Sequence, residues 1–423
     1  MKTTALKLYG KNDLRLETFE LPEIKDDEIL AKVVSDSLCM SSYKATIQGA
    51  DHKRVPDNVA ENPIIIGHEF CGEFVKIGAK WANDYKVGDK FVVQPSMNYQ
   101  GSLDAPGYSF SYYGGDATYI IIPAIAIELG CVLPYFGNSF FYGSLGEPMS
   151  CIVGGYHANY HHKKQGYYEH VMGIKEGGYA AILAGVGPMG LGAIDYAIHN
   201  PRKPKLLVVT DISKDRLARA KEILPVEEAE KNGVKLIYVD TSDIADPVAY
   251  LKELADGNSY DDVFVFAPVK PVVEMGDKLL GKDGCMNFFA GPTNPQFTAE
   301  FNFYNVHYGS THIVGTSGGN TDDLKESIKM METKQINPAA MITHVGGLDC
   351  AAEATKNLPN IPGGKKLIYT HISMPLTAIA DFEELGKTDP MFKKLDEIVK
   401  AHNGLWNDEA EEYLLKNAKA LNI

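Results

Sequence analysis

Between residues 179 and 266 the chain alternates short apolar runs with segments of helical pattern. The apolar runs predict buried strands and the intervening segments predict helices. Parallel strands need a long crossover between them, which a helix supplies, so this alternation favours a doubly wound α/β sheet. The expected strands are 179–183, 206–210, 236–239, 263–266, 287–291 and 312–315, and the expected helices are 189–198, 214–223 and 247–254.

A glycine-rich turn, Gly-Val-Gly-Pro-Met-Gly, follows the first of these strands and opens the first helix. In such a turn the first glycine makes the bend, the second lets the backbone approach a pyrophosphate, and the third lets the helix pack closely. The pattern alone also fits a plain tight turn, but its place between strand and helix favours a nucleotide, because a helix N-terminus attracts phosphate. The expected cofactor-binding residues here are Gly185, Gly187, Pro188, Met189 and Gly190.

Asp211 stands at the end of the next strand and is expected to complete the cofactor site. A carboxylate there would accept hydrogen bonds from ribose hydroxyls and would repel a 2′-phosphate, which favours NAD(H) over NADP(H). Lys214 and Arg216 follow closely in sequence and keep NADP(H) open. Asp211 would also serve as the N-cap of the helix that it precedes.

The first third of the chain is predicted to be rich in β-strands and supplies possible metal ligands. Cys39, His68, Glu69 and Glu147 offer a thiolate, an imidazole and carboxylates, which suit a borderline-soft divalent ion such as zinc. The His68-Glu69 pair stands inside an apolar run, where a bare charge is costly and needs a partner. Each residue also has a structural interpretation: Cys39 as a core thiol, His68 as a hydrogen-bonded core histidine, and Glu147 as an acid at a helix N-terminus.

The charge balance limits the possible partners. Fifty-five acidic residues against 41 basic ones give a net charge of −14, and such a surface repels nucleic acid and anionic membranes. The six cysteines are scattered without paired spacing, which is typical of a reducing compartment. We see no signal peptide and no apolar segment long enough to span a bilayer, so we expect a cytoplasmic protein.

Taken together, these motifs resemble the zinc-dependent medium-chain alcohol and polyol dehydrogenases, over about residues 4–369. The resemblance implies a β-rich GroES-like catalytic domain at 1–155 and 317–372 and a Rossmann domain at 156–316. A helical C-terminal extension at 373–423 would follow. It also implies one catalytic zinc ion held by Cys39, His68 and a glutamate, which is either Glu69 or Glu147.

The resemblance assigns further roles around the zinc site. Ser41 would begin a proton relay, and the glutamate that is not bound to metal would orient the zinc water or a sugar hydroxyl. Tyr43 and Lys44 lie on the substrate side, and Lys44 replaces the family's relay histidine. The loop at 94–115 contains no cysteine, so the second, structural zinc of many relatives is not expected.

Within the family, segments 363–369, 374–379 and 381–386 and the tail around Trp406 are similar to L-sorbose-1-phosphate reductases. That likeness implies an NAD(P)(H) oxidoreductase that converts L-sorbose 1-phosphate to D-glucitol 6-phosphate. It also implies a homo-oligomer, a dimer or tetramer, for which the strand with Ile313 and Val314 offers an edge. The basic residues nearest to Cys39 in sequence would bind the phosphate or form a solvated surface cluster; they are Lys44, His52, Lys53 and Arg54.

Two other functions stay open at this point. The first is an NAD-dependent polyol dehydrogenase that acts on an unphosphorylated sugar alcohol. The second is a non-catalytic nucleotide-binding or redox-sensing protein on the same scaffold. The set of Cys39, His68 and Glu69 argues against the second, because a protein without catalysis has no need of an intact metal site.

Overall fold

The computed structural model describes residues 1–164 and 167–422. Its chain forms two compact units, which we describe separately. Unit 1 comprises Met1–Pro148, Asn320–Glu332 and Ile342–Ile423, and unit 2 comprises Met149–Gly319 and Thr333–Met341. The domain boundaries expected at residues 155, 316 and 372 stay predictions. Within the described part of the chain, no helix is long and apolar enough to cross a membrane.

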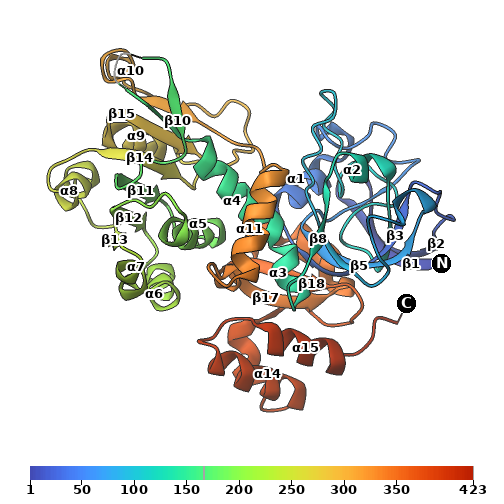
Figure 1. The fold of residues 1–423 in the computed structure, drawn as a ribbon. Coiled ribbons are helices and arrows are strands. Elements are labelled where there is room, and N and C mark those ends of the chain that lie inside the picture. Colours follow the sequence, from blue (N-terminus) through green and yellow to red (C-terminus); the bar gives the residue numbers. More distant parts are fainter. Residues whose placement is uncertain (165–166, 423) are drawn as a thin grey trace. The chain divides into compact units, whose positions relative to one another are not determined.

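Unit 2 is built on a six-stranded sheet in the order β13-β12-β11-β14-β15-β16, with every neighbouring pair parallel. This order is that of the doubly wound dinucleotide-binding fold, so the predicted parallel sheet is confirmed (Figure 1). The strands are β11 (Tyr179–Leu183), β12 (Leu206–Asp211), β13 (Lys235–Asp240), β14 (Tyr260–Val265), β15 (Leu280–Phe288) and β16 (His312–Val314). The helices are α5 (Pro188–His199), α6 (Lys214–Ile223), α7 (Val226–Lys231), α8 (Pro247–Leu254), α9 (Lys270–Leu279) and α10 (Phe303–Gly309).

The central strands of unit 2 contain continuous apolar runs, which are buried because helices cover both faces of the sheet. Val208, Val263 and Val265 are fully buried in one cluster. Helices α6, α8 and α10 begin after residues whose side chains accept from free backbone N–H groups of the first turn. The side chain of Asp246, for example, accepts from the backbone N–H of Ala249 at 3.0 Å at the start of α8.

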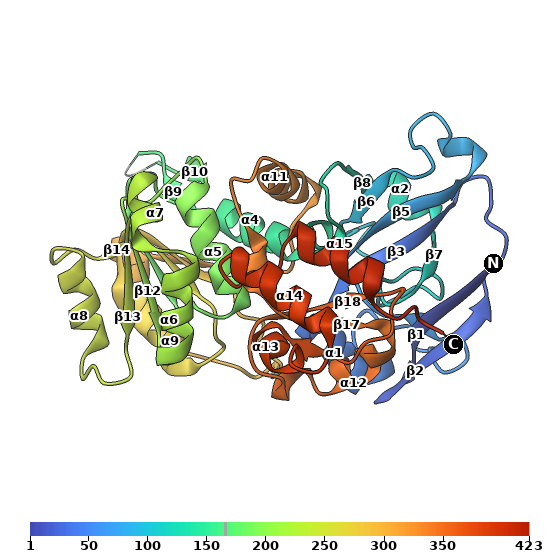
Figure 2. The same cartoon turned by 90° about the horizontal axis from the view of Figure 1, so that it is seen from below.

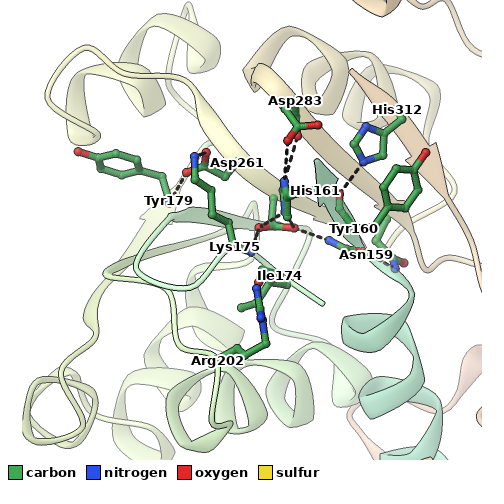
Figure 3. A network of polar contacts seen from close by, with 12 residues as sticks. Asn159, Tyr160, His161, Ile174, Lys175, Tyr179, Arg202, Asp261, Asp283 and His312 are labelled. Atoms are coloured by element: carbon green, nitrogen blue, oxygen red, sulfur yellow. Dashed lines mark hydrogen bonds and ion pairs between the residues drawn. The ribbon is translucent and has the colours of Figure 1, made fainter. Parts of the chain in front are cut away.

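A buried polar network ties a small hairpin, β9 (Tyr160–His162) and β10 (His170–Met172), to the sheet (Figure 3). Asp262 accepts hydrogen bonds from Asn159 Nδ2 at 2.6 Å and from the backbone N–H of Lys175 at 2.8 Å. His161 Nε2 lies 3.2 Å from both Asp262 oxygens. Burial works to lower the pKa of His161, but the hydrogen bond and charge of Asp262 outweigh it and raise that pKa. Asp262 lies away from the carboxyl end of β14, where ligands bind in such sheets, so we interpret this network as structural.

Unit 1 contains an eight-stranded sheet in the order β19-β17-β18-β3-β5-β6-β8, with β7 paired to β3, and a three-stranded sheet in the order β2-β1-β4. Its β-rich character is as predicted. The strands are β1 (Lys2–Gly10), β2 (Asp13–Glu20), β3 (Ile29–Ser37), β4 (Ile64–Ile65), β5 (Phe70–Ile77), β6 (Lys90–Val93), β7 (Tyr119–Ile122), β8 (Val132–Tyr135), β17 (Ile342–Gly347), β18 (Lys365–Tyr369) and β19 (Thr377–Ala378). The α-helices are α1 (Met40–Gln48), α2 (Ala124–Glu128), α3 (Phe140–Ser144), α11 (Thr321–Glu332), α12 (Ala351–Lys356), α13 (Phe382–Leu385), α14 (Pro390–Ala401) and α15 (Asp408–Asn417), and α4 (Gly146–Ala158) begins here.

The C-terminal extension packs beside β17 and β18, where both ribbon views place α14 and α15 (Figures 1 and 2). The spacing of apolar and charged residues in this extension predicts amphipathic helices at 390–402 and 408–421. The first lies close to α14, but the second ends at Asn417 rather than Leu421. The residues beyond it run alongside another segment instead: Ser373 N–H donates to Lys419 O at 2.8 Å, and Leu421 N–H donates to His371 O at 3.0 Å. These backbone partners outweigh continuation of the helix.

Glu411 on α15 is a buried carboxyl that joins the extension to two other elements. One oxygen accepts from the backbone N–H of Phe140 at 2.6 Å and the other from that of Phe141 at 2.8 Å, at the start of α3. Tyr369 Oη at the end of β18 donates to the second oxygen at 2.9 Å, and Trp406 Nε1 donates to Tyr369 Oη at 2.8 Å. Burial raises the pKa of Glu411 to about 7, although these donors work in the opposite direction.

The raised pKa of Glu411 predicts that the stability of the protein depends on pH. The substitution Glu411→Gln should remove this dependence. Between the carboxyl pKa of the unfolded chain, about 4.3, and pH 7 the folded protein holds a proton that the unfolded chain has released. The free energy of unfolding therefore falls as pH rises through this window and is level above it. Because Gln does not ionise, the variant should gain stability relative to the wild type across the window, by an amount on the order of 3 kcal/mol.

Urea unfolding followed by Trp406 fluorescence, at several pH values, measures this gain. Glu412→Gln is the matched control, since Glu412 is the exposed neighbour of Glu411. A stability difference between wild type and Glu411→Gln that does not vary with pH would contradict the prediction.

Candidate metal and cofactor sites

Three side chains that can bind a metal lie together in unit 1. One donor atom each of Cys39, His68 and Glu69 lie within 4.8 Å of one another. Cys39 precedes the first turn of α1, while His68 and Glu69 directly precede β5. Gly67 allows this placement, because its φ is +90° and an added Cβ would come within 2.3 Å of Asp36 Oδ2. The structure therefore brings three of the four predicted ligands into one group.

The donors suit a cation. Burial raises the pKa of the Cys39 thiol to about 12, and the charge of Glu69 adds to this effect. Burial also lowers the pKa of His68 to about 4, so its imidazole is neutral and able to donate a lone pair. A divalent ion would stabilise the thiolate that burial disfavours, and thiolate, imidazole and carboxylate are the donor set of catalytic zinc.

Glu69 has a partner that the sequence analysis missed, Lys365 at the start of β18. Lys365 Nζ lies 2.5 Å from each oxygen of Glu69, and the Ser37 hydroxyl donates to the same carboxylate. Burial alone would raise the pKa of Glu69, but Lys365 outweighs it, and the pKa is lowered. Burial works to lower the pKa of Lys365, but Glu69 reverses this and raises it. Glu69 is thus an ionised carboxylate held in one orientation.

Glu147 lies in the first turn of α4 and is buried. It is not part of the close group of donors, but its charge contributes to raising the pKa values of Cys39, Tyr108 and Lys365. The second carboxylate is therefore near the site. Whether Glu69 or Glu147 binds the metal directly stays a prediction.

A second buried pair, Asp36 and Asp116, lies beside the candidate metal ligands and contacts the backbone of Glu69. Asp36 Oδ1 accepts the backbone N–H of Glu69 at 3.0 Å. The other Asp36 oxygen and both Asp116 oxygens are buried without a hydrogen-bond donor from any other described residue, and the two carboxyls form a side-chain hydrogen bond with each other. Burial raises the pKa of Asp36 well above its ordinary value, and that of Asp116 to about 7. We conclude that the two carboxyls share a proton, since two like charges in such a place repel each other.

The hydroxyls beside His68 differ in part from the prediction. Ser42 Oγ lies 3.3 Å from His68 Nδ1, and Tyr108 Oη lies 3.3 Å from His68 Nε2; neither residue was singled out from the sequence. The predicted relay residue Ser41 is partly buried and forms a side-chain hydrogen bond with Tyr108. Its relay role stays a prediction. Tyr43 packs partly buried against an apolar cluster, and Lys44 is partly exposed.

In unit 2, the glycine turn has the geometry that a pyrophosphate needs. A Cβ at Gly190 would lie 2.1 Å from Gly185 O, so only glycine lets α5 pack this closely on the turn. A Cβ at Gly187 would meet nothing within 4 Å, which leaves open space beside the backbone at the start of α5. Pro188 and Met189 form the first turn of that helix. These features fit a phosphate group at the helix N-terminus.

Asp211 lies at the end of β12, and only one of its two carboxylate oxygens accepts hydrogen bonds from described residues. Its Oδ1 accepts from the backbone N–H of Ile212 at 2.9 Å and of Ser213 at 3.0 Å, and from Arg216 Nη2 at 2.9 Å. Its Oδ2 is buried without a hydrogen-bond partner among the described residues. The N-cap of α6 is Ser213, so the alternative in which Asp211 caps this helix is wrong. A buried acceptor without a donor fits a ribose hydroxyl.

Two family models, several relatives and many solved structures are similar to this chain. Family models match residues 25–129 (alcohol dehydrogenase GroES-like domain) and 188–333 (zinc-binding dehydrogenase). The chain is 55% identical over 415 residues to mannitol-1-phosphate 5-dehydrogenase of Aliivibrio fischeri, covering 98% of each chain. It is 49% identical over 417 residues to L-sorbose 1-phosphate reductase of Klebsiella pneumoniae, covering 99% of this chain and 98% of that one. The solved structure of 2R,3R-butanediol dehydrogenase from Bacillus subtilis has a TM-score of 0.70 at 22% identity and covers 87% of this chain and 99% of that one.

The chain belongs to the zinc-dependent alcohol dehydrogenase family. It is an oxidoreductase that acts on CH–OH groups, so the alternative of a non-catalytic protein is not supported. The predicted fold class, a GroES-like domain with a doubly wound Rossmann domain, is confirmed.

The ion pair of Glu69 predicts a measurable loss of stability on Lys365→Met. The substitution leaves a buried carboxylate without its partner, and such a change costs about 3–5 kcal/mol. We expect this loss in urea unfolding of the zinc-free protein. Adding Glu69→Gln removes the unpaired charge, so the double variant should recover at least half of the loss.

Lys76→Met is the control for this experiment, because Lys76 forms an exposed pair with Glu23 and should contribute little. The assignment of a stabilising ion pair fails if Lys365→Met unfolds at the same urea concentration as Lys76→Met.

Proposed function

We propose that this enzyme is a zinc-dependent, NAD(H)-linked oxidoreductase that interconverts a ketose phosphate and a polyol phosphate. The pair that we favour is L-sorbose 1-phosphate and D-glucitol 6-phosphate. The observation that carries the proposal is the close group of Cys39, His68 and Glu69 in a chain 49% identical over nearly its whole length to an L-sorbose 1-phosphate reductase. The 55% identity to a mannitol-1-phosphate 5-dehydrogenase favours D-mannitol 1-phosphate as the second candidate substrate.

In this proposal zinc is held by Cys39, His68 and Glu69, the residues whose donor atoms lie close together. A bound zinc ion supplies Lewis acidity that polarises the substrate carbonyl. Lys365 and Ser37 hold the Glu69 carboxylate ionised and in one orientation, as outer partners of metal ligands commonly do. Glu147 then accepts hydrogen bonds from substrate hydroxyls. Ser41 passes the proton between the substrate oxygen and solvent.

Bound NADH supplies the hydride. The turn of Gly185, Gly187 and Gly190 holds its pyrophosphate at the start of α5, and Asp211 Oδ2 accepts hydrogen bonds from the ribose hydroxyls. The carboxylate of Asp211 repels a 2′-phosphate, and Arg216, which could otherwise bind one, is already paired with Asp211 at 2.9 Å. Both facts support NAD(H) over NADP(H).

The expected homo-oligomer, a dimer or tetramer, also belongs to this proposal. β16 lies at the edge of the six-stranded sheet, and Ile313 on it is 44% exposed. An apolar side chain on an unpaired edge strand supports association of two copies there.

Zinc content distinguishes the roles of the two glutamates. Glu69→Gln should lower the affinity for zinc at least tenfold, since it removes the charge of a ligand and leaves Lys365 without its ion-pair partner. Glu147→Gln should keep one zinc per chain but lower kcat about 100-fold, because it removes a group that positions the substrate. Elemental analysis after dialysis against graded chelator measures the first, and steady-state kinetics the second.

Cys39→Ser serves as the positive control for zinc loss, and Glu73→Gln, on the partly exposed stretch of β5, as the negative one. The opposite pattern, with zinc lost in Glu147→Gln and kept in Glu69→Gln, would identify Glu147 as the direct ligand.

A substrate panel tests the activity itself. L-sorbose 1-phosphate and D-fructose 6-phosphate would be assayed beside L-sorbose and D-fructose, each with NADH and with NADPH. We expect the phosphorylated ketoses to have at least 100-fold higher kcat/KM, and NADH to exceed NADPH at least tenfold. Equal or better turnover of the free sugars would replace the proposal with a dehydrogenase of unphosphorylated polyols.

A further inference from the structure

Tyr108 connects the metal-ligand residues to a group of basic side chains. Its buried ring lies 4.9 Å from the ring of His68, centroid to centroid. The same ring stacks on His52, with centroids 5.5 Å apart and planes 11° apart. The guanidinium carbon of Arg54 lies 5.5 Å from the Tyr108 centroid. Arg54 and His52 are thus only one aromatic ring away from the proposed metal ligand.

Hydrogen bonds fix the backbone of Arg54 and the ring of His52. The hydroxyl of Ser109 donates to Arg54 O at 2.8 Å, and the backbone N–H of Arg54 donates to His52 Nδ1 at 3.3 Å. Because Nδ1 accepts this hydrogen bond, the neutral His52 ring carries its proton on Nε2, which is then a donor. Both side chains are partly exposed, so a ligand can reach them.

The positive charges of Arg54 and Lys53 have no acidic counterpart among the described residues. Arg54 and Lys53 form no ion pair with any described carboxylate, and the neighbouring Asp51 is paired with Lys11. Burial lowers the pKa of His52 to about 4, and the charges of Arg54, Lys53 and Lys44 lower it further. In a chain of net charge −14, like charges gathered beside a catalytic site indicate that an anion binds there.

We propose that Arg54 and the Nε2–H group of His52, with Lys44 beside them, bind the phosphate of the substrate. Tyr108 sets the spacing between that phosphate and the carbon that reacts. The inference rests on the proposed function and adds the residues that give it its preference for a phosphate monoester. A guanidinium matches two phosphate oxygens at once, and the ring of Tyr108 holds it in place through a cation–π contact.

Arg54→Met tests the assignment, with two pairs of substrates that differ only in the phosphate: L-sorbose 1-phosphate with L-sorbose, and D-fructose 6-phosphate with D-fructose. We expect kcat/KM for the ketose phosphate that the wild type prefers to fall about 100-fold, mostly through KM, because the lost contact holds the substrate before and during reaction alike. The kcat/KM for the free sugar should change less than threefold. Arg54→Lys should recover part of the loss, since it keeps the charge but not the fork of donors.

Lys53→Met is the matched control, because Lys53 is the exposed neighbour of Arg54 and makes no contact with Tyr108. The preference for phosphate is the ratio of kcat/KM for the ketose phosphate to kcat/KM for the free sugar. Lys53→Met should keep at least a third of the wild-type ratio. The inference is overturned if Arg54→Met retains this preference, or if its kcat/KM falls equally for the ketose phosphate and the free sugar. Either result leaves the proposed function in place. A wild type without any preference for phosphate overturns the proposed function and the inference with it.

Binding of inorganic phosphate gives a second measurement that does not depend on turnover. In the zinc-free wild type, phosphate should raise the melting temperature and sharpen the nuclear magnetic resonance signals of the His52 ring. Both effects should be absent in Arg54→Met and weaker than in the wild type in Arg54→Lys at the same concentration. An equal response in wild type and variants would place the phosphate elsewhere and reject the assignment.

Discussion

The buried pair of Glu69 and Lys365 is the interaction on which the proposed metal site depends. Three neighbouring strands of one sheet, in the order β18-β3-β5, bring its members together. Ser37 ends β3, Glu69 precedes β5 and Lys365 begins β18, and the register pairs Ser37 with Leu367 and Asp36 with Phe70. Slippage of any strand by one residue would turn these side chains to the other face of the sheet. The hydrogen-bonded register therefore fixes the orientation of a proposed metal ligand.

Charge balance explains why Lys365 lies beside a site that we propose binds a cation. Cys39 as thiolate, Glu69 and Glu147 together carry more negative charge than one divalent ion neutralises, and burial makes any surplus costly. Lys365 supplies the missing positive charge without occupying a position at the metal. Its raised pKa keeps it protonated. The same lysine stabilises the buried carboxylate of Glu69 directly, since its Nζ contacts both oxygens.

The sequence predicted what local patterns encode and missed what long-range pairing decides. The alternation of strands and helices from 179 to 266, the glycine turn and the group of Cys39 and His68 follow from periodicity and motif. Lys365 lies 296 residues from Glu69, so no local pattern links them. The need of Glu69 for a buried partner was visible from the sequence, and the lysine that begins the buried strand Lys365–Tyr369 was the signal that could have supplied one. The early end of α15 was missed for the same reason, because its competitor is a distant segment.

The C-terminal extension is joined to the same scaffold as the metal-ligand residues. β18 begins with Lys365, which pairs with Glu69, and ends with Tyr369, which donates to Glu411 of the extension. Glu411 also accepts both free N–H groups at the start of α3, and the next helix begins with the turn that holds Glu147. One strand and one short helix thus connect the extension to both carboxylates of the site. Loss of the extension would remove Glu411 and leave the buried N–H groups of Phe140 and Phe141 and the hydroxyl of Tyr369 without their acceptor, which is costly. It would also expose apolar core. The extension is for this reason part of the fold of unit 1 rather than an addition to it.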